Sequence, residues 1–315
     1  SKALTPFFSR LLGGKMRKKY LEFASKTTHE VLRSITQNET LIKVLTGQYG
    51  DYGLPPKQSS FAMHATVVRH YFNGGSFPVG GSSKIIQTID PVIEKGCGTI
   101  LINAEVDKIL IEKNKAIGVQ MKDGRKFYAK NVVSSTGIFN TYEKLIPSAV
   151  LKKYKMQKQL QKVNPSVAHA CLYIGFKGSP QALGLPKNNL WIYPEKGDHD
   201  SIVAKYLKDP QAPFPVVYIS FPAAKDPSWP DRYPDRSTID IITLLPFDLV
   251  KQWEGTHWMK RGKDYEQLKA EMSDRLLEIL YQQLPHLKGK VDHQELSTPL
   301  STQNFVNYKE GEIYG

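Results

Sequence analysis

The stretch of residues 77–137 constrains the fold most, because it combines helix and strand patterns in a fixed order. It opens on the turn PVGGSS at 78–83 and passes through a helical pattern and several short apolar runs. It closes on an apolar run at 132–137 that ends in small residues. Small residues at the carboxyl end of a buried strand leave room for a ligand. We therefore expect a ligand-binding α/β unit in this part of the chain.

The pattern within this stretch predicts one helix and a series of strands. Ser82 and Ser83 are suited to cap the helix, which ends near Gly96. Its apolar face comprises Ile85, Ile86, Ile89, Val92 and Ile93. Strands are expected at 99–102, 106–112, 116–122, 125–129 and 130–134. We expect this meander to cover one side of a larger sheet.

One motif that often accompanies such a unit is absent. In Gly-x-Gly-x-x-Gly, placed between a strand and a helix, the glycines let the backbone approach a pyrophosphate. No such motif follows a strand in the 315 residues. The stretch alone therefore does not complete a dinucleotide site.

The first 47 residues have helical spacing. Apolar residues are followed there by a basic cluster, in the order Phe7, Phe8, Leu11, Leu12, Lys15, Arg17, Lys18 and Lys19. This pattern suits a helix that lies on an anionic membrane, and equally an amphipathic helix docked on its own domain. We favour the docked helix.

A Gly-rich and Pro-rich segment at 47–56 interrupts the helical pattern. Tyr49 and Tyr52 in this segment either line a flat apolar ligand site or pack the loop. A further helix is expected at 61–72, because Ser59 and Ser60 precede it and glycines follow it.

The second half of the chain has a different character. A basic helical pattern at 139–162 precedes apolar, aromatic-rich strand patterns at 169–177, 189–193, 216–221 and 238–245. A long loop is expected at 226–234, and helices at 247–256 and 265–284. These features predict an antiparallel sheet, which is a common wall of an apolar pocket.

The charge balance limits the partners. Lys and Arg number 43 against 30 Asp and Glu, which gives a net charge of +13. An anionic membrane surface, an anionic cofactor or a plain solvated surface would each account for it. Nucleic acid is not expected as a partner, because neither a zinc finger nor an RNP aromatic pair occurs.

Other classes of site find little support in the sequence. No apolar run reaches the ~18 residues of a membrane span, and residue 1 is neither an initiator Met nor the start of a signal peptide. Cys97 and Cys171 are expected to be small buried hydrophobes in a reducing compartment, although their number leaves one bridge open. We predict no metal site, because His257, His286 and His293 lack ligand spacing.

Several segments taken together resemble the retinol saturase family and its bacterial relatives. They follow one another over nearly the whole chain, at 47–53, 70–74, 78–83, 132–137, 139–143, 221–229, 231–238, 260–266 and 314–315. Carotenoid isomerases and phytoene desaturases are similar over a smaller part, mainly 78–81 and 119–134.

This resemblance implies an FAD-dependent oxidoreductase, with NAD or NADP as the possible electron donor. Family members reduce, desaturate or isomerise double bonds of retinoids and carotenoids. The implied fold class is α/β, becoming α+β in the second half: part of a glutathione-reductase-type FAD domain, plus a substrate domain with an antiparallel sheet and helices. Family members build the cofactor site from three parts of the chain, and we expect only the middle part here.

The resemblance also implies a division of the chain. Residues 1–75 would be a helical part of the substrate domain, and 76–145 the middle part of the FAD domain. Residues 146–300 would hold the antiparallel sheet of the substrate domain. Residues 301–315 would return toward the FAD domain.

Two segments are implied as cofactor-binding. Val106 matches the strand residue whose backbone sits against the adenine in this family. Ser135, Thr136 and Gly137 match the small-residue turn below the dinucleotide. Backbone hydrogen bonds to a flat base and close approach to a pyrophosphate both require small side chains. Without the resemblance, these residues are simply a strand and a turn.

An apolar slot suits a polyene, and aromatic strand residues in the second half are candidates to line it. They are Tyr173, Phe176, Trp191, Tyr193, Tyr218 and Phe221. Each is equally suited to a core position. His64, His70 and Tyr71 are candidate proton donors or acceptors whose geometry the sequence does not fix.

The sequence thus favours an FAD-dependent oxidoreductase of retinoids or carotenoids that is cytoplasmic or peripheral to a membrane. We expect it to be present here as a fragment that is not catalytically competent alone. The alternative is a catalytically inert fragment, or a remnant that binds apolar ligands without flavin.

Overall fold

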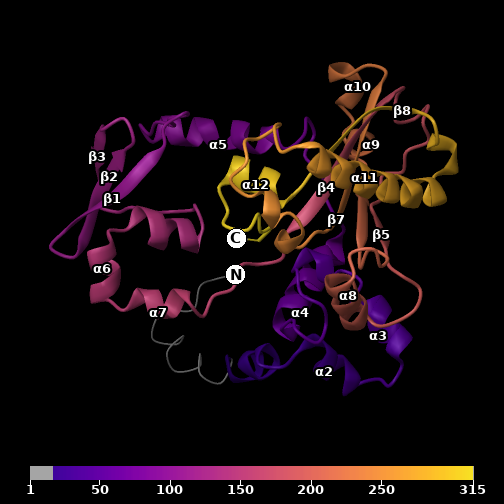
Figure 1. Cartoon of the computed structure of the whole chain (residues 1–315), viewed down its shortest axis with the longest axis horizontal. Helices are drawn as coiled ribbons and strands as arrows, with labels where there is room; N and C mark the ends of the chain where they lie inside the picture. Colours follow the sequence, from indigo (N-terminus) through magenta and orange to yellow (C-terminus); the bar gives the residue numbers. More distant parts are fainter. Residues whose placement is uncertain (1–16, 315) are drawn as a thin grey trace. The chain divides into compact units, whose positions relative to one another are not determined.

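The computed structural model describes residues 17–314, which form two compact units (Figure 1). The first comprises the described residues up to Phe77 together with Asn188–Ser220 and Ile241–Leu244. The second comprises Pro78–Lys187, Phe221–Asp240 and the rest of the described chain from Leu245. Each unit is considered in turn.

The first unit is mainly helical. Its helices include α2 (Thr28–Arg33), α3 (Glu39–Leu45), α4 (Phe61–His70) and α8 (His199–Lys208), with short 3₁₀ turns η1 (Tyr49–Asp51) and η2 (Tyr71–Asn73). Residues 17–24 are also helical. Two short strands complete it, β5 (Leu190–Ile192) and β6 (Val217–Ser220).

Local capping explains why the helical pattern expected for the first 47 residues is divided. Thr27 forms a reciprocal capping box with Glu30 at the start of α2, and the Asn38 side chain accepts a hydrogen bond from Leu41 at the start of α3. Each cap residue has extended backbone, so each begins a new helix. The expected amphipathic segment around Phe7 and Leu11 lies outside the described residues.

The second unit contains a three-stranded antiparallel meander in the order β1-β2-β3. Its strands are β1 (Val106–Glu112), β2 (Lys115–Met121) and β3 (Lys126–Tyr128). The β1–β2 turn has positive φ at Lys113 and Asn114, as tight hairpins require. The sequence prediction of these three strands is confirmed.

The strands expected at 99–102 and 130–134 do not form. Both segments lack a ladder partner among the described residues, and a strand needs a neighbour for its backbone hydrogen bonds. Their apolar side chains are exposed, 81% for Ile102 and 93% for Val133. The apolar pattern of these segments was identified correctly, but nothing in the described chain covers it.

Helix α5 (Ser83–Lys95) begins and ends close to where it was expected. Ser82, however, makes no capping hydrogen bond, and the expected apolar face is not buried. Its exposed members are Ile85, Ile86, Ile89 and Val92.

The larger sheet has five strands in the order β5-β6-β7-β4-β8. It adds β4 (His169–Lys177), β7 (Arg236–Leu244) and β8 (Val291–Ser297) to β5 and β6. The β4–β8 and β5–β6 pairs are antiparallel, which confirms the expected sheet type. The sequence missed β8, because Asp292, His293, Gln294 and Glu295 give it no apolar run.

The alternation of buried side chains along the strands shows where the core of the second unit lies. Ala170, Leu172, Ile174 and Phe176 of β4 are buried, and Ile239 of β7 is fully buried as well. Because side chains alternate along a strand, the residues between them lie on the other face of the sheet. That second face carries a candidate ligand site described below.

The remaining helices of the second unit are mostly short. They are the π-helix η3 (Asn140–Leu145), α6 (Ser148–Lys153), α7 (Met156–Leu160), α9 (Pro222–Lys225), α10 (Trp229–Arg232), α11 (Lys263–Gln283) and α12 (Pro299–Val306), with 3₁₀ turns η4 (Phe247–Leu249), η5 (Lys251–Trp253) and η6 (Pro285–Leu287). The helix expected at 247–256 is therefore two 3₁₀ turns, and that expected at 139–162 is divided into three. None of the helices in residues 17–314 has the length and apolarity needed to cross a membrane.

We predict that Gly118→Ala destabilises the meander. Gly118 has φ +155° in the central strand, and an added Cβ would lie 2.1 Å from the Phe127 carbonyl oxygen. We expect a loss of about 2–4 kcal/mol, read as faster amide hydrogen exchange in β1–β3. Gly124→Ala is the control: its φ is +88°, but its Cβ would have no neighbour within 4 Å, so about 1–2 kcal/mol is expected. Equal effects of the two variants would contradict the steric argument.

Candidate functional site

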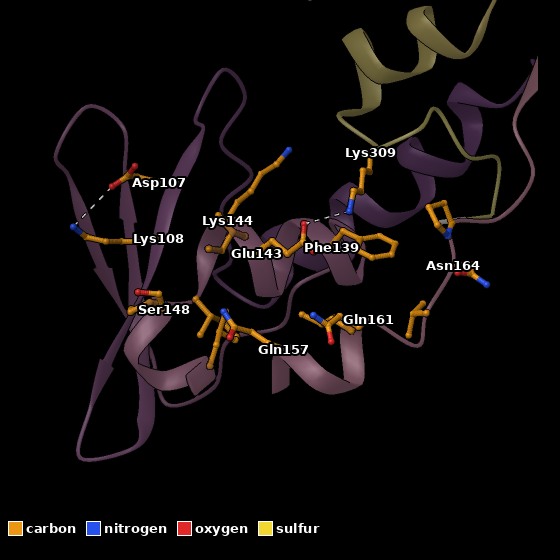
Figure 2. A pocket seen from close by; sticks show the side chains of 17 residues that line it. Asp107, Lys108, Phe139, Glu143, Lys144, Ser148, Gln157, Gln161, Asn164 and Lys309 are labelled. Atoms are coloured by element: carbon orange, nitrogen blue, oxygen red, sulfur yellow. Dashed lines mark ion pairs between the residues drawn. The ribbon is translucent and has the colours of Figure 1, made fainter. Parts of the chain in front are cut away.

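The first candidate site is a cavity of about 980 Å³ beside β1, which we call the β1 cavity (Figure 2). Strand β1 contacts the π-helix η3, and both contribute to its wall. The lining residues are Asp107, Lys108, Phe139, Glu143, Lys144, Leu145, Ile146, Pro147, Ser148, Leu151, Gln157, Leu160, Gln161, Val163, Asn164, Pro165 and Lys309.

Charged groups surround the β1 cavity. Lys309 lies 4.8 Å from the centre of the Phe139 ring and 3.8 Å from a carboxylate oxygen of Glu143. Lys108 lies 3.9 Å from Asp107. These contacts are exposed or long, so they contribute little stability and leave the lysines able to meet an anionic ligand.

The two predicted cofactor segments do not line this cavity but are close in sequence to residues that do. Val106 is half-buried and is the first residue of β1, directly before Asp107 and Lys108. Ser135 and Thr136 are exposed, and Gly137 is half-buried with φ +86°. Gly137 directly precedes the helical segment that carries Phe139 into the cavity wall.

Hydrogen bonds hold the turn at 135–137 in place. Asn140 Nδ2 donates to the Thr136 carbonyl at 2.9 Å and to the Asn307 carbonyl at 2.8 Å. The hydroxyl of Thr141 lies 2.7 Å from that of Ser134 and 3.2 Å from that of Thr136. The turn is therefore held by side chains, and the Thr136 carbonyl takes part in these hydrogen bonds.

A second polar centre fixes the turn at 78–83. The side chain of Asp226 is 1% exposed, and its Oδ1 accepts hydrogen bonds from the Gly80 amide at 3.0 Å, the Ser228 amide at 2.9 Å and the Ser228 hydroxyl at 2.8 Å. Arg232 forms an ion pair with its other oxygen. We call this group the Asp226 latch. It attaches the glycine turn at the start of α5 to the loop at 226–234.

The latch also sets the charge of Asp226. Burial alone would raise the pKa of this carboxyl, but the hydrogen bonds from Gly80, Ser228 and Arg232 outweigh it and lower the pKa to about 2. The guanidinium of Arg232 also lies over the rings of Trp229 and Tyr233, at 5.6 and 5.2 Å from their centres. This role of Asp226 could not be predicted from the sequence, because Gly80 and Asp226 are distant along the chain.

The third site is a cleft of about 750 Å³ in the second unit, which we call the aromatic cleft. Its lining combines aromatic and aliphatic side chains with a few charged ones. The lining residues are Tyr173, Trp258, Met259, Arg261, Tyr265, Glu266, Lys269, Glu295, Ser297, Ser301, Thr302, Phe305 and Val306. The rings of Trp258 and Phe305 meet edge to face at 5.1 Å.

The six aromatic pocket candidates are distributed over three places. Tyr173 lines the aromatic cleft. Phe176 and Phe221 are fully buried and line neither of the two cavities. The other three, Trp191, Tyr193 and Tyr218, belong to the first unit.

In the first unit these aromatics form a packed cluster around the Gly-rich segment. Tyr49 is buried, its hydroxyl donates to the Pro215 carbonyl at 3.4 Å, and its ring lies 6.0 Å from that of Tyr193. An added Cβ at Gly50 would lie 2.6 Å from the Trp191 ring, so the glycine permits this close approach. Tyr49 therefore packs the loop.

The candidate proton-transfer residues of the first unit lie near this loop. Tyr52 Oη lies 3.0 Å from His64 Nδ1, and burial lowers the pKa of His64, which favours the neutral imidazole. His70 and Tyr71 are exposed at the end of α4.

The cysteines differ from expectation in one respect. Cys171 is buried, as predicted, but Cys97 is exposed in the turn after α5, where its φ is +56°. Both are free thiols. Across residues 17–314, no group of three or more His, Cys, Asp or Glu side chains is placed to hold a metal ion.

The fold of this chain is similar to that of a protein of known structure. No model of a known protein family matches the chain. A crystal structure of an oxidoreductase from Methanosarcina mazei superposes with a TM-score of 0.58 at 19% identity, over 92% of this chain and 59% of that chain. The fold is thus shared with an oxidoreductase.

Proteins related in sequence indicate a narrower class of protein than the fold does. An all-trans-retinol 13,14-reductase of Danio rerio is 34% identical over 304 residues, which cover 94% of this chain and 50% of that protein. A chloroplastic prolycopene isomerase of Arabidopsis thaliana is 27% identical over 249 residues, covering 78% of this chain and 38% of that protein. The chain spans about half the length of the retinol reductase. It is homologous to the all-trans-retinol 13,14-reductases and, more distantly, to the prolycopene isomerases, which confirms the resemblance seen in its motifs.

We predict that the Asp226 latch makes stability depend on pH. The folded pKa of about 2 lies below the ordinary 3.8, so the latch stabilises the fold fully above about pH 4 and loses this effect as the pH falls toward 2. Asp226→Asn should lower the free energy of unfolding by about 1–3 kcal/mol at pH 6, and the gap from the wild type should close toward pH 2. Chemical denaturation between pH 6 and 2 measures both.

Asp123→Asn is the matched control for this prediction. Asp123 pairs with Arg125 at the surface, where both side chains are about half exposed. Its replacement should change stability much less than replacement of the buried Asp226. If the difference in free energy of unfolding between the wild type and Asp226→Asn stays constant over the whole pH range, the proposed role of the Asp226 latch is contradicted.

Proposed function

We propose that this protein is an FAD-dependent oxidoreductase that acts on double bonds of a retinoid or carotenoid-like polyene. The observation that carries the proposal is the 34% identity to an all-trans-retinol 13,14-reductase over 94% of the chain. The similarity to a prolycopene isomerase extends the proposed substrate class to longer polyenes. Reduction, desaturation and isomerisation all remain within the proposal.

The residues proposed to hold the cofactor suit a dinucleotide. Strand β1 is at the edge of its sheet, so the backbone of Val106 has a side without a ladder partner among the described strands. A flat base that binds through backbone groups needs such an edge. Ser135 and Thr136 are exposed residues followed by Gly137 with positive φ, a turn that could accept a phosphate. The lysines around the β1 cavity favour an anionic ligand.

The division of chemical roles follows from these groups. A bound flavin supplies hydride transfer, with NAD or NADP as the proposed electron donor. The residues of this chain would position the dinucleotide through Val106 and Ser135–Gly137 and accept the apolar substrate against aromatic side chains. The net charge of +13 suits approach to an anionic membrane surface that dissolves a polyene.

A second candidate is an apolar-ligand-binding protein that holds no flavin. The aromatic cleft favours it, because an aromatic-lined cleft of about 750 Å³ binds an apolar molecule without any cofactor. The two candidates differ in absorbance, because only the first holds a flavin.

The first candidate predicts a flavin band near roughly 450 nm in the purified protein, and the second predicts none. Gly137→Val should lower the flavin bound per protein about tenfold, because a side chain at φ +86° strains the turn that is proposed to contact the cofactor. Gly255→Val, at φ +77° with no neighbour within 4 Å, is the control and should keep its flavin. A colourless wild-type protein that takes up no added FAD would support the second candidate.

Product analysis separates the reactions within the proposal. The protein is incubated with all-trans-retinol or a poly-cis carotene, and products are identified by mass spectrometry. A gain of two hydrogens indicates saturation, a loss of two indicates desaturation, and an unchanged mass with a new retention time indicates isomerisation. Unaltered substrates in the presence of bound flavin would contradict the proposed substrate class.

A further inference from the structure

One wall of the aromatic cleft is built by the pairing of β4 with β8. Cys171 lies opposite Ser297, and Tyr173 lies opposite Glu295. Because side chains alternate, Cys171 and Tyr173 share the face opposite to that of buried Leu172. Paired residues project to the same face, so all four side chains are neighbours on the cleft side of the sheet.

Three of these residues form a polar group that we call the polar floor: Cys171, Tyr173 and Ser297. The Tyr173 phenol interacts with the Cys171 thiol and with the Ser297 hydroxyl. Tyr173 is 48% exposed, and both Tyr173 and Ser297 line the cleft. The polar floor therefore presents hydroxyl groups to a ligand, with the thiol buried behind them.

The polar floor is uncharged at neutral pH. Burial raises the pKa of Tyr173 to about 12 and that of Cys171 to about 12. Asp240 of β7 lies near both groups, with Lys225 beside it. A neutral phenol both donates and accepts a hydrogen bond, which matches the hydrogen-bonding capacity of an alcohol.

The cations that line the cleft already have partners. Arg261 is buried and donates to the carbonyl oxygens of Thr256 at 2.9 Å and Leu300 at 3.3 Å. Lys269 pairs with Glu295 and lies 3.8 Å from Glu266. Arg261 and Lys269 are matched by Glu266 and Glu295 among the lining residues, so the cleft has no net positive charge to attract a ligand carboxylate. The charge arrangement thus gives no preference for an anionic end group.

The other walls are apolar and accessible. Trp258, Met259, Phe305 and Val306 are all exposed along the cleft. The volume of about 750 Å³ lies within the range of roughly 300–1,000 Å³ for small-molecule sites. Apolar walls with a neutral polar group at one side are suited to a molecule that is apolar along its length and polar at one end.

We propose that the aromatic cleft binds an elongated apolar alcohol, whose hydroxyl hydrogen-bonds to Tyr173 and Ser297 while its chain lies against Trp258 and Phe305. This inference rests on the proposed function, because it assigns the place and the end group of that substrate class. It names Tyr173 as the residue that distinguishes an alcohol from a hydrocarbon or an acid.

Equilibrium binding to the full chain tests the proposal without turnover or added cofactor. The probes are all-trans-retinol, the hydrocarbon that lacks its hydroxyl, and all-trans-retinoic acid. The wild type should bind retinol more tightly than either of the others. Tyr173→Phe should weaken retinol binding about 2- to 10-fold, the effect of one neutral hydrogen bond, and leave hydrocarbon binding unchanged.

Two further variants complete the test. Tyr265→Phe is the matched control: Tyr265 also lines the cleft, but its hydroxyl is buried and lies 2.7 Å from that of Thr298, so retinol affinity should be retained. Ser297→Ala should reproduce the selective loss and replaces Tyr173→Phe if thermal unfolding shows that the latter does not fold. Phe305→Ala should weaken retinol and hydrocarbon binding equally.

Three outcomes would overturn the proposal. The first is an equal effect of Tyr173→Phe on retinol and hydrocarbon, or no effect. The second is tighter binding of retinoic acid than of retinol. The third is that Phe305→Ala reduces binding to phosphatidylserine vesicles but not to retinol, which would make this face a membrane contact. A missing flavin band, by contrast, contradicts only the proposed function.

Discussion

The hydrogen-bond ladder around β4 is the constraint on which the second unit depends. β4 lies between β7 and β8 in the sheet, so both of its backbone edges are paired and its side chains must alternate between two faces. Leu172 and Ile174 consequently enter the core, while Tyr173 on the other face lines the aromatic cleft. A shift of one residue in this register would exchange the two sets, burying a phenol in the core and exposing leucine.

The Asp226 latch shows how a buried charge is kept in this fold. An isolated carboxylate would be costly to bury, but three donated hydrogen bonds and an arginine satisfy this one. Asp226 thereby fixes a glycine turn, in which φ is +93° at Gly80 and +83° at Gly81. Stability and turn geometry are thus linked through a single side chain.

The sequence predicted those elements whose signal is local. β1, β2, β4 and β7 have apolar alternation or clear turn residues, and each was located within a few positions. The segments at 99–102 and 130–134 have the right composition but no partner strand in the described chain, so apolarity alone did not make them strands. β8 shows the converse: a polar segment becomes a strand because β4 offers it an edge.

The candidate sites were less predictable than the fold. Val106 and Gly137 are predicted as cofactor-binding only through family resemblance, and the walls of the cavities come from residues far apart in sequence. Tyr173, Trp258 and Phe305 meet only because β4, the segment before α11 and the end of α12 converge. No local pattern encodes such a meeting, and Asp226 could not be linked to Gly80 for the same reason.

The edges of the five-stranded sheet bear on how the protein behaves in a crowded solution. An open edge offers backbone groups to a strand of another molecule, which is a route to aggregation. Here β5 at one edge is only three residues long, and β8 at the other carries Asp292, His293 and Glu295. A short edge strand and a charged edge strand both disfavour the addition of a strand from another molecule. The polar composition of β8, which prevented its prediction from the sequence, therefore also protects the sheet from edge-to-edge aggregation.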